Sequence, residues 1–165
     1  MKLLGLLAAL AATLAACATP APPAEPVYFV MRHLHTPAGE HDPDLTAEGQ
    51  RHAALLANWF GEEALEAVYV SSYQRSRQTA APLAARLGLT PVVYDPRDTP
   101  GLLARVRQGP FPALIVGHSN TVPDIIEQLG GERPGPLAHE DFGHIWRVAR
   151  GTSQRFRLGL ADGNW

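Results

Sequence analysis

The amino-acid sequence predicts an α/β protein, a three-layer α/β/α sandwich with a mostly parallel central sheet. Short apolar runs rich in β-branched residues alternate along the chain with stretches of helical periodicity, as in parallel sheets covered by helices. The most hydrophobic run, ALIVG at 113–117, has no polar alternation, which indicates a central strand buried on both faces. The chain shows no internal repeat and no second domain, so we expect one folded unit over residues 27–165.

The individual elements follow from local patterns. Strands are expected at 27–31, 67–71, 91–94 and 113–117, with a closing hairpin of 144–149 and 154–160 joined by 150–153. Helices are expected from Thr46 to about Phe60, from about Tyr73 to Leu87, over Leu102–Val106 and over 121–129. Thr46 can cap the first helix, and Gly88 can end the second. Pro82 conflicts with the second helix because it lacks a backbone N–H, and it predicts a kink or a later start.

Composition excludes several classes of protein. The 165 residues carry 14 Lys and Arg against 16 Asp and Glu, a net charge of −2, so no broad cationic surface is available for nucleic acid. A chain that is 45% hydrophobic and 18% charged has the composition of a folded protein rather than a disordered one. Its single cysteine excludes a disulfide scaffold and a multi-thiolate metal site.

The start of the chain has the features of an export signal. Lys2 precedes the apolar segment Leu3–Ala16, which is shorter than the ~20 residues of a membrane-spanning helix. The segment ends at Leu14-Ala15-Ala16-Cys17, which resembles the lipobox of bacterial lipoproteins. That resemblance implies a signal peptide at 1–16 and a lipid-modified Cys17. The alternative is an ordinary secretory leader, with Cys17 incidental.

Residues 17–26 are expected to form a linker rather than part of the core. Residues 18–26 contain four prolines and no large apolar side chain, which favours an extended spacer. Together with the lipobox resemblance, this predicts a membrane partner through a lipid anchor at Cys17 and a location in the cell envelope. Ala18 after the cysteine suggests the periplasmic face of the outer membrane in a Gram-negative host.

Polar side chains follow three of the predicted strands. The first strand leads to Arg32 and His33, the second to a helix that carries Arg75, and the central one to His118 and Ser119. Because ligands gather at the carboxyl ends of parallel strands, these residues are expected to converge. Guanidinium groups match phosphoryl oxygens two at a time, and a neutral imidazole can attack phosphorus and hold the phosphoryl group. The sequence therefore predicts a phosphate pocket.

These residues resemble the histidine phosphatase superfamily, also called phosphoglycerate-mutase-like. Its motifs are Arg-His-Gly, then Ser-x-x-x-Arg-x-x-x-Thr-Ala, then Gly-His-Ser/Gly-x-Thr. They stand here as Arg32-His33-Leu34, Ser71…Arg75…Thr79-Ala80 and Gly117-His118-Ser119-Asn120-Thr121, and Leu45–Gln50 is similar to the family's helix start. The resemblance covers 27 to about 130. It implies a phosphoglycerate-mutase-like fold and a phosphohydrolase, without metal or other cofactor, that acts on phosphomonoesters or phosphohistidine.

The resemblance also implies roles for individual residues. His33 would be the nucleophile that forms a phosphohistidine intermediate. Arg32, Arg75 and His118 would surround the phosphate of a small phosphorylated substrate.

Thr36 and Ser119 are expected to contact the substrate at the same site. The general acid of the family commonly follows the third strand, where Asp98 is favoured over Asp95. Two carboxylates in the loop after the first motif are further alternatives: Asp42 and Asp44.

The chain departs from the family at two points. Leu34 stands in place of glycine and can reshape the loop beside the phosphate. Only 20 positions separate Asp98 from His118, which leaves no room for the long capping insertion of the mutases. The site is therefore expected to be open, and a phosphatase is favoured over a mutase.

Two other functions are compatible with the sequence. One is a lipoprotein that binds a phosphorylated ligand without turnover. The other is a metal-dependent hydrolase, although Arg32 would oppose a cation there. Its ligands would come from five residues near the first strand: His33, His35, His41, Asp42 and Asp44.

Overall fold

The computed structural model describes residues 25–39, 41–61 and 65–159, so the predicted signal peptide and Cys17 lie outside the described residues. The strands are β1 (Tyr28–Arg32), β2 (Ala67–Ser71), β3 (Val92–Tyr94), β4 (Ala113–Gly117), β5 (His144–Ala149) and β6 (Thr152–Arg157). The helices are α1 (Ala47–Trp59), α2 (Gln74–Leu87), α3 (Thr99–Gln108) and α4 (Val122–Gln128). Among the described residues, no helix has the length and apolarity that a bilayer span requires.

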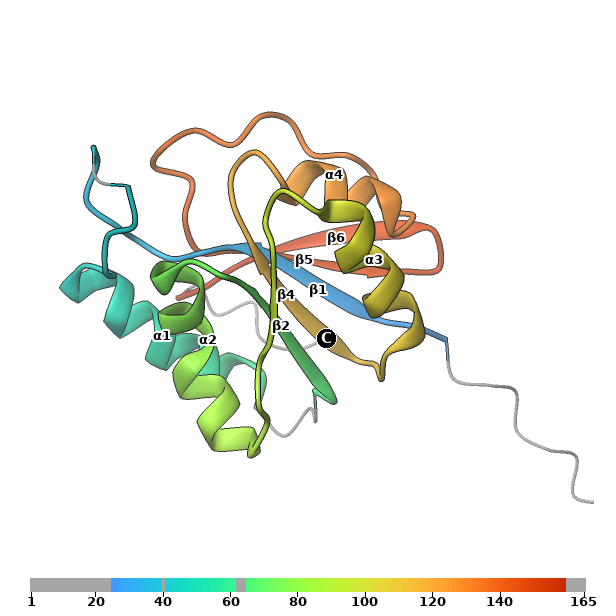
Figure 1. Ribbon diagram of the computed structural model, residues 1–165, viewed down its shortest axis with the longest axis horizontal. Coiled ribbons are helices and arrows are strands. Elements are labelled where there is room, and N and C mark those ends of the chain that lie inside the picture. Colours follow the sequence, from blue (N-terminus) through green and yellow to red (C-terminus); the bar gives the residue numbers. More distant parts are fainter. Residues whose placement is uncertain (1–24, 40, 62–64, 160–165) are drawn as a thin grey trace, which may run out of the picture.

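The six strands form one mixed sheet in the order β3-β2-β4-β1-β5-β6 (Figure 1). β1 to β4 are parallel, whereas β5 pairs antiparallel with both β1 and β6. β4 is central, as its apolar sequence predicts, and all five of its residues are buried. The predicted α/β class with a mostly parallel sheet is therefore confirmed.

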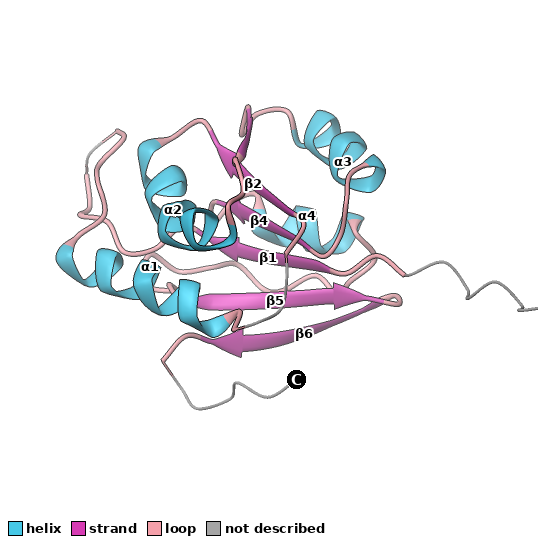
Figure 2. Ribbon diagram, turned by 90° about the horizontal axis from the view of Figure 1, so that it is seen from below, coloured by secondary structure: helices cyan, strands magenta, loops and turns pink. Residues whose placement is uncertain are grey.

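Each face of the sheet is covered by one pair of helices (Figure 2). Along β1, Phe29 and Met31 join the core cluster under α1 and α2. Tyr28 and Val30 point the other way and join the cluster under α3 and α4. This alternation follows from the two-residue period of a strand. It produces two separate apolar layers and completes the predicted three-layer sandwich.

Two helices differ from the sequence-based prediction. α3 contains the predicted helical segment Leu102–Val106 but is longer at both ends, and it begins at Thr99 because the Asp98 carboxylate accepts a hydrogen bond from Gly101 N at 2.9 Å and caps the helix. α2 runs from Gln74 with Pro82 inside it, so the later start that this proline suggested is wrong. Its predicted end is confirmed, since Gly88 has the left-handed backbone with φ 66°.

The closing hairpin is tighter than predicted. Its second strand begins at Thr152 rather than 154, and Arg150 and Gly151 alone connect the strands. Both residues have positive φ angles, 53° and 73°, as a two-residue hairpin turn that follows the sheet twist requires. Arg150 rather than glycine or asparagine occupies the first of these positions, so the sequence did not indicate a two-residue turn.

The loop after β1 lies directly against the first turn of α1. Thr46 caps the helix by accepting from Gly49 N at 3.1 Å, and its own N–H donates to His35 O at 2.9 Å. A Cβ atom at Gly49 would lie only 2.5 Å from His35 O. Glycine at position 49 therefore lets the helix start close to the strand that carries His33.

We predict that Gly49→Ala destabilises the fold, although alanine is the better helix former by ~1 kcal/mol. Overpacking against the His35 carbonyl costs roughly 1–3 kcal/mol, so a net loss is expected in the free energy of unfolding, measured in urea. Ala54, exposed on the same helix, provides the control, since Ala54→Gly reports helix propensity alone. A more stable Gly49→Ala protein would contradict the close contact.

Candidate active site

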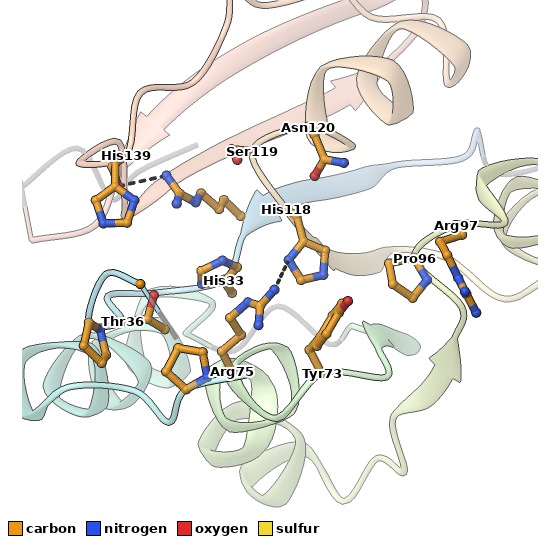
Figure 3. Close-up of a pocket in the computed structure, with 14 residues that line it drawn as sticks. His33, Thr36, Tyr73, Arg75, Pro96, Arg97, His118, Ser119, Asn120 and His139 are labelled. Atoms are coloured by element: carbon orange, nitrogen blue, oxygen red, sulfur yellow. Dashed lines mark hydrogen bonds between the residues drawn. The ribbon is translucent and has the colours of Figure 1, made fainter. Parts of the chain in front are cut away.

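The three predicted motifs meet at the carboxyl edge of the sheet. Arg32 lies opposite Gly117 in the β1–β4 register, and His33 N donates to Gly117 O at 2.9 Å. His33 and His118 therefore leave adjacent strand ends, and their ring centroids are 5.3 Å apart. They line a cavity of about 330 Å³ together with Arg32 and Arg75 (Figure 3).

His33 is held as a neutral imidazole with one nitrogen free. Its Nδ1 lies 2.9 Å from Leu34 O, and because a carbonyl oxygen only accepts, Nδ1 carries the proton. Nε2 therefore keeps its lone pair. Burial lowers the pKa of His33 to about 3, with smaller contributions from His118, Arg32 and Arg75. A free ring nitrogen beside two guanidinium groups is suited to attack on phosphorus.

His118 belongs to a chain of buried polar groups. Its Nε2 lies 2.8 Å from Ser71 Oγ, which itself donates to Ser76 Oγ at 2.8 Å, so Nε2 is the donor to Ser71. Nδ1 then faces Arg75 Nη2 at 3.4 Å. Burial lowers the pKa of His118 to about 4, and the charges of Arg75 and Arg32 add to the effect. Ser76, fully buried, was not singled out by the sequence motifs.

Arg32 is a buried cation shared between the cavity and a distant loop. Its Nη1 donates to Ala138 O at 2.7 Å and His139 O at 3.1 Å, and its guanidinium lies 4.2 Å over the Phe142 ring. Its Nε is buried and has no hydrogen-bond partner in the described part of the chain. Burial lowers the pKa of Arg32, and Asp141 opposes this. A buried guanidinium that lines a cavity favours an anion there.

Arg75 reaches the cavity from the first turn of α2. Its Nη1 contacts His41 O at 3.2 Å and Asp42 Oδ1 at 3.3 Å. Its guanidinium lies 4.1 Å over the Tyr73 ring. The helix, the ring and the loop after β1 thus fix the direction of this side chain toward His118.

Of the other predicted site residues, some line the cavity and others make contacts outside it. Thr36 and Ser119 line the cavity. Asp98 instead caps α3, and Asp95 pairs with Arg97, whose Nη2 is 3.1 Å from Oδ2. Asp44 accepts from Gln78 at 2.6 Å.

Among the described residues that line the cavity, none is a carboxylate. Four lining residues with polar side chains were given no role in the sequence-based prediction of the site: Tyr73, Arg97, Asn120 and His139.

Leu34 does not face the cavity. Its side chain is fully buried in the core under α1 and α2. Its N–H donates to Thr79 Oγ1 at 2.9 Å, and its carbonyl accepts from His33. The residue that replaces the family's glycine therefore packs in the apolar core.

The ligands of the alternative metal-dependent hydrolase are not brought together. His33 faces the cavity, whereas His35 Nε2 lies 3.5 Å from Glu48 Oε1 on α1. Asp42 contacts Arg75. In the described part of the chain, the cavity holds no cluster of metal-ligating side chains, and the one cluster found is formed by His35, Glu48 and His52.

This geometry agrees with a comparison of the sequence with known families. Residues 29–97 match the histidine phosphatase superfamily (branch 1). The match includes Arg32, His33 and Arg75, and His118 lies beyond it. The predicted resemblance to this superfamily is therefore found over this segment of the chain. No curated protein gives a significant match to the chain.

Solved structures share the fold over nearly their full length. The protein histidine phosphatase SixA, complexed with tungstate, is 22% identical with a TM-score of 0.60, covering 80% of this chain and 96% of that chain. The alpha-ribazole phosphatase from Shigella flexneri is 16% identical with a TM-score of 0.61, covering 81% and 96%. A mycobacterial glucosyl-3-phosphoglycerate phosphatase is 14% identical with a TM-score of 0.60, covering 84% and 100%. At these identities the similarity establishes the fold.

We predict that the His118 imidazole of the free protein titrates near pH 4 rather than 6.5, because burial and the two guanidinium groups disfavour its charged form. Since the unfolded chain takes up this proton at a higher pH, the contribution of His118 to stability is full above 6.5 and falls toward pH 4. Inorganic phosphate should raise the midpoint, because a bound anion offsets the guanidinium charges. NMR titration measures the His118 midpoint with and without the anion. A midpoint of 6.5 without the anion would contradict the described site.

We also predict that Leu34→Ala lowers the free energy of unfolding by about 2–5 kcal/mol, because it leaves a cavity in the core. Leu55, which is 42% exposed on α1, gives the matched control, and Leu55→Ala should change stability by less than about 1 kcal/mol. Urea unfolding of the two variants tests this. Equal losses would show that Leu34 does not occupy the core.

Proposed function

We propose that the protein is a phosphatase of the histidine phosphatase type, which transfers a phosphoryl group to His33 and then to water. The observation that carries the proposal is the free Nε2 of a neutral, buried His33 beside Arg32, Arg75 and His118. The match to the superfamily over 29–97 supports it. So does the fold shared with several phosphatases.

In the first step, His33 Nε2 attacks phosphorus, a P–N bond forms, and the bond to the leaving group breaks. Arg32 and Arg75 neutralise charge on the equatorial oxygens, the main task of a protein in phosphoryl transfer. In the second step, water attacks the phosphohistidine and the P–N bond breaks. Inorganic phosphate leaves, and the electron pair returns to Nε2. We propose that no metal ion takes part, because the guanidinium groups supply the positive charge. A brief chelator treatment should then leave kcat unchanged.

The departing oxygen of a phosphomonoester needs a proton, which a positioned acid can supply. Asp98 remains the proposed donor and Asp95 the alternative, and a movement of the loop at 95–98 would be needed to bring either carboxyl group to the substrate. Asp42 is already held against Arg75 at 3.3 Å. Changing each residue to Asn and measuring kcat at several pH values distinguishes the three.

The lack of a carboxylate among the described lining residues favours substrates whose leaving group departs without much help. Phosphohistidine, with an imidazole leaving group, is such a substrate, and one structure of similar fold is a protein histidine phosphatase. A series of aryl phosphates tests this preference. If Asp98 stays at the cap of α3 when such a substrate binds, kcat/KM should fall steeply as the pKa of the leaving phenol rises. A flat dependence would point to an acid that acts in the substrate complex.

We further propose that Cys17 is lipid-modified after removal of residues 1–16, and that residues 17–26 link the membrane to a phosphatase domain at 27–165. The proposal rests on the leader and lipobox pattern. It places the enzyme in the cell envelope, at the periplasmic face of the outer membrane in a Gram-negative host. Metabolic labelling with a fatty acid, lost in Cys17→Ser, tests the anchor.

We predict that His33→Ala lowers phosphatase activity by about 10³-fold or more, as is typical when a nucleophile is removed. The wild-type protein should form an acid-labile phosphoenzyme with a ³²P-labelled substrate, and His33→Ala should form none. His144, half-buried on β5, gives a matched control, and His144→Gln should keep both properties. Turnover that survives in His33→Ala would overturn the mechanism. Vanadate binding without turnover of any ester or phosphohistidine would instead identify a binding protein.

A further inference from the structure

A second group of ligating side chains lies outside the cavity, between the loop after β1 and α1. One ligand atom each from His35, Glu48 and His52 lies within 4.8 Å of the others. His35 Nε2 and Glu48 Oε1 are 3.5 Å apart, and the two imidazole centroids are 4.7 Å apart. Ligands bound to one Zn²⁺ at 2.0–2.2 Å in tetrahedral geometry are about 3.3–3.5 Å from each other. Small side-chain rotations would therefore bring all three onto one ion.

The two histidines also have unused hydrogen-bonding capacity. Nδ1 of His35 and Nδ1 of His52 are both buried and have no hydrogen-bond partner in the described structure. Buried polar atoms are nearly always paired, so the unpaired nitrogen of His52 is available to an ion. At His35 the nitrogen that lies beside Glu48 is Nε2, and the ion would bind there. Neither imidazole is used by the proposed phosphatase mechanism, so the cluster has no role in that chemistry.

The backbone holds the three residues in place before any ion binds. Glu48 and His52 are four positions apart on α1 and therefore lie on the same face of the helix. His35 is fixed against the first turn of that helix, since its carbonyl accepts from Thr46 N at 2.9 Å and lies close to Gly49. Binding of a metal ion would therefore cost little further backbone entropy.

We propose that His35, Glu48 and His52 form a binding site for one divalent transition-metal ion of the Zn²⁺ class. Two imidazole nitrogens and one carboxylate oxygen suit such borderline ions, whereas Mg²⁺ and Ca²⁺ prefer oxygen ligands alone. The Glu48 side chain is 55% exposed and that of His35 21%, so the ion can enter from solvent and keep a water ligand. The ion ties the loop that carries His33 to α1.

The charges around the cluster are compatible with a cation. Glu48 supplies one negative charge directly, and the His35 ring packs on the apolar Phe142 ring at 4.5 Å. Arg32, the one guanidinium among the charges that act on His35, directs its Nη1 to the carbonyl groups of Ala138 and His139. The site and the phosphate cavity thus remain separate, and metal binding is independent of the proposed phosphatase activity.

Calorimetric titration of the full chain with Zn²⁺ tests the site. One ion per chain is expected, with affinity reduced at least tenfold in His52→Gln and in Glu48→Gln. Three control variants should bind as the wild type does: His41→Gln, Cys17→Ser and His118→Gln. Zn²⁺ should raise the melting temperature of the wild type but not of His52→Gln, and Mg²⁺ should raise neither.

NMR of the wild-type protein keeps the test independent of variant folding. Zn²⁺ should shift the imidazole resonances of His35 and His52 and leave those of His144 unchanged. The proposal is overturned if the wild type binds no Zn²⁺, or if His52→Gln binds it with unchanged affinity. It is equally overturned if binding is lost in His118→Gln, which would locate the ion in the phosphate cavity.

Discussion

The pairing of β1 with β4 is the constraint on which the active-site arrangement depends. Its register sets Arg32 opposite Gly117 and continues for one more hydrogen bond, from His33 N to Gly117 O. Glycine is required at 117, because a Cβ there would lie 2.9 Å from Thr121 Oγ1, and that hydroxyl accepts from His118 N at 3.0 Å. If β1 shifted by one residue relative to β4, its side chains would change faces, and the imidazoles of His33 and His118 would no longer lie side by side.

Burial and charge act together on the two imidazoles. Removal from water disfavours imidazolium, and the nearby guanidinium groups of Arg32 and Arg75 add repulsion, so both rings stay neutral across the physiological range. The same guanidinium groups attract an oxyanion. The cavity therefore combines uncharged imidazoles with a positive environment, which is the combination that the proposed attack on a phosphate dianion requires.

Much of this arrangement could be predicted from the sequence because its signals are local. The strand-end motifs placed Arg32, His33 and His118 at one sheet edge, and Thr46 marked the start of α1. Contacts between distant segments left no such signal. The bonds from Arg32 to Ala138 and His139 span more than 100 positions. The cap at Asp98 is different, because it joins residues only three positions apart. Asp98 before Thr99 and Pro100 is typical of a helix start, so this signal was present in the sequence although the family resemblance implied another role for Asp98.

Leu34 links the hydrophobic core to the orientation of His33, the proposed nucleophile. Its side chain is buried, its N–H is held by Thr79, and its carbonyl fixes His33 Nδ1. An imidazole on an exposed loop would lose rotational entropy each time it aligned with a substrate. Here that entropy is lost once, when the chain folds, and core packing offsets it. The orientation of the His33 ring therefore depends on the apolar layer beneath it.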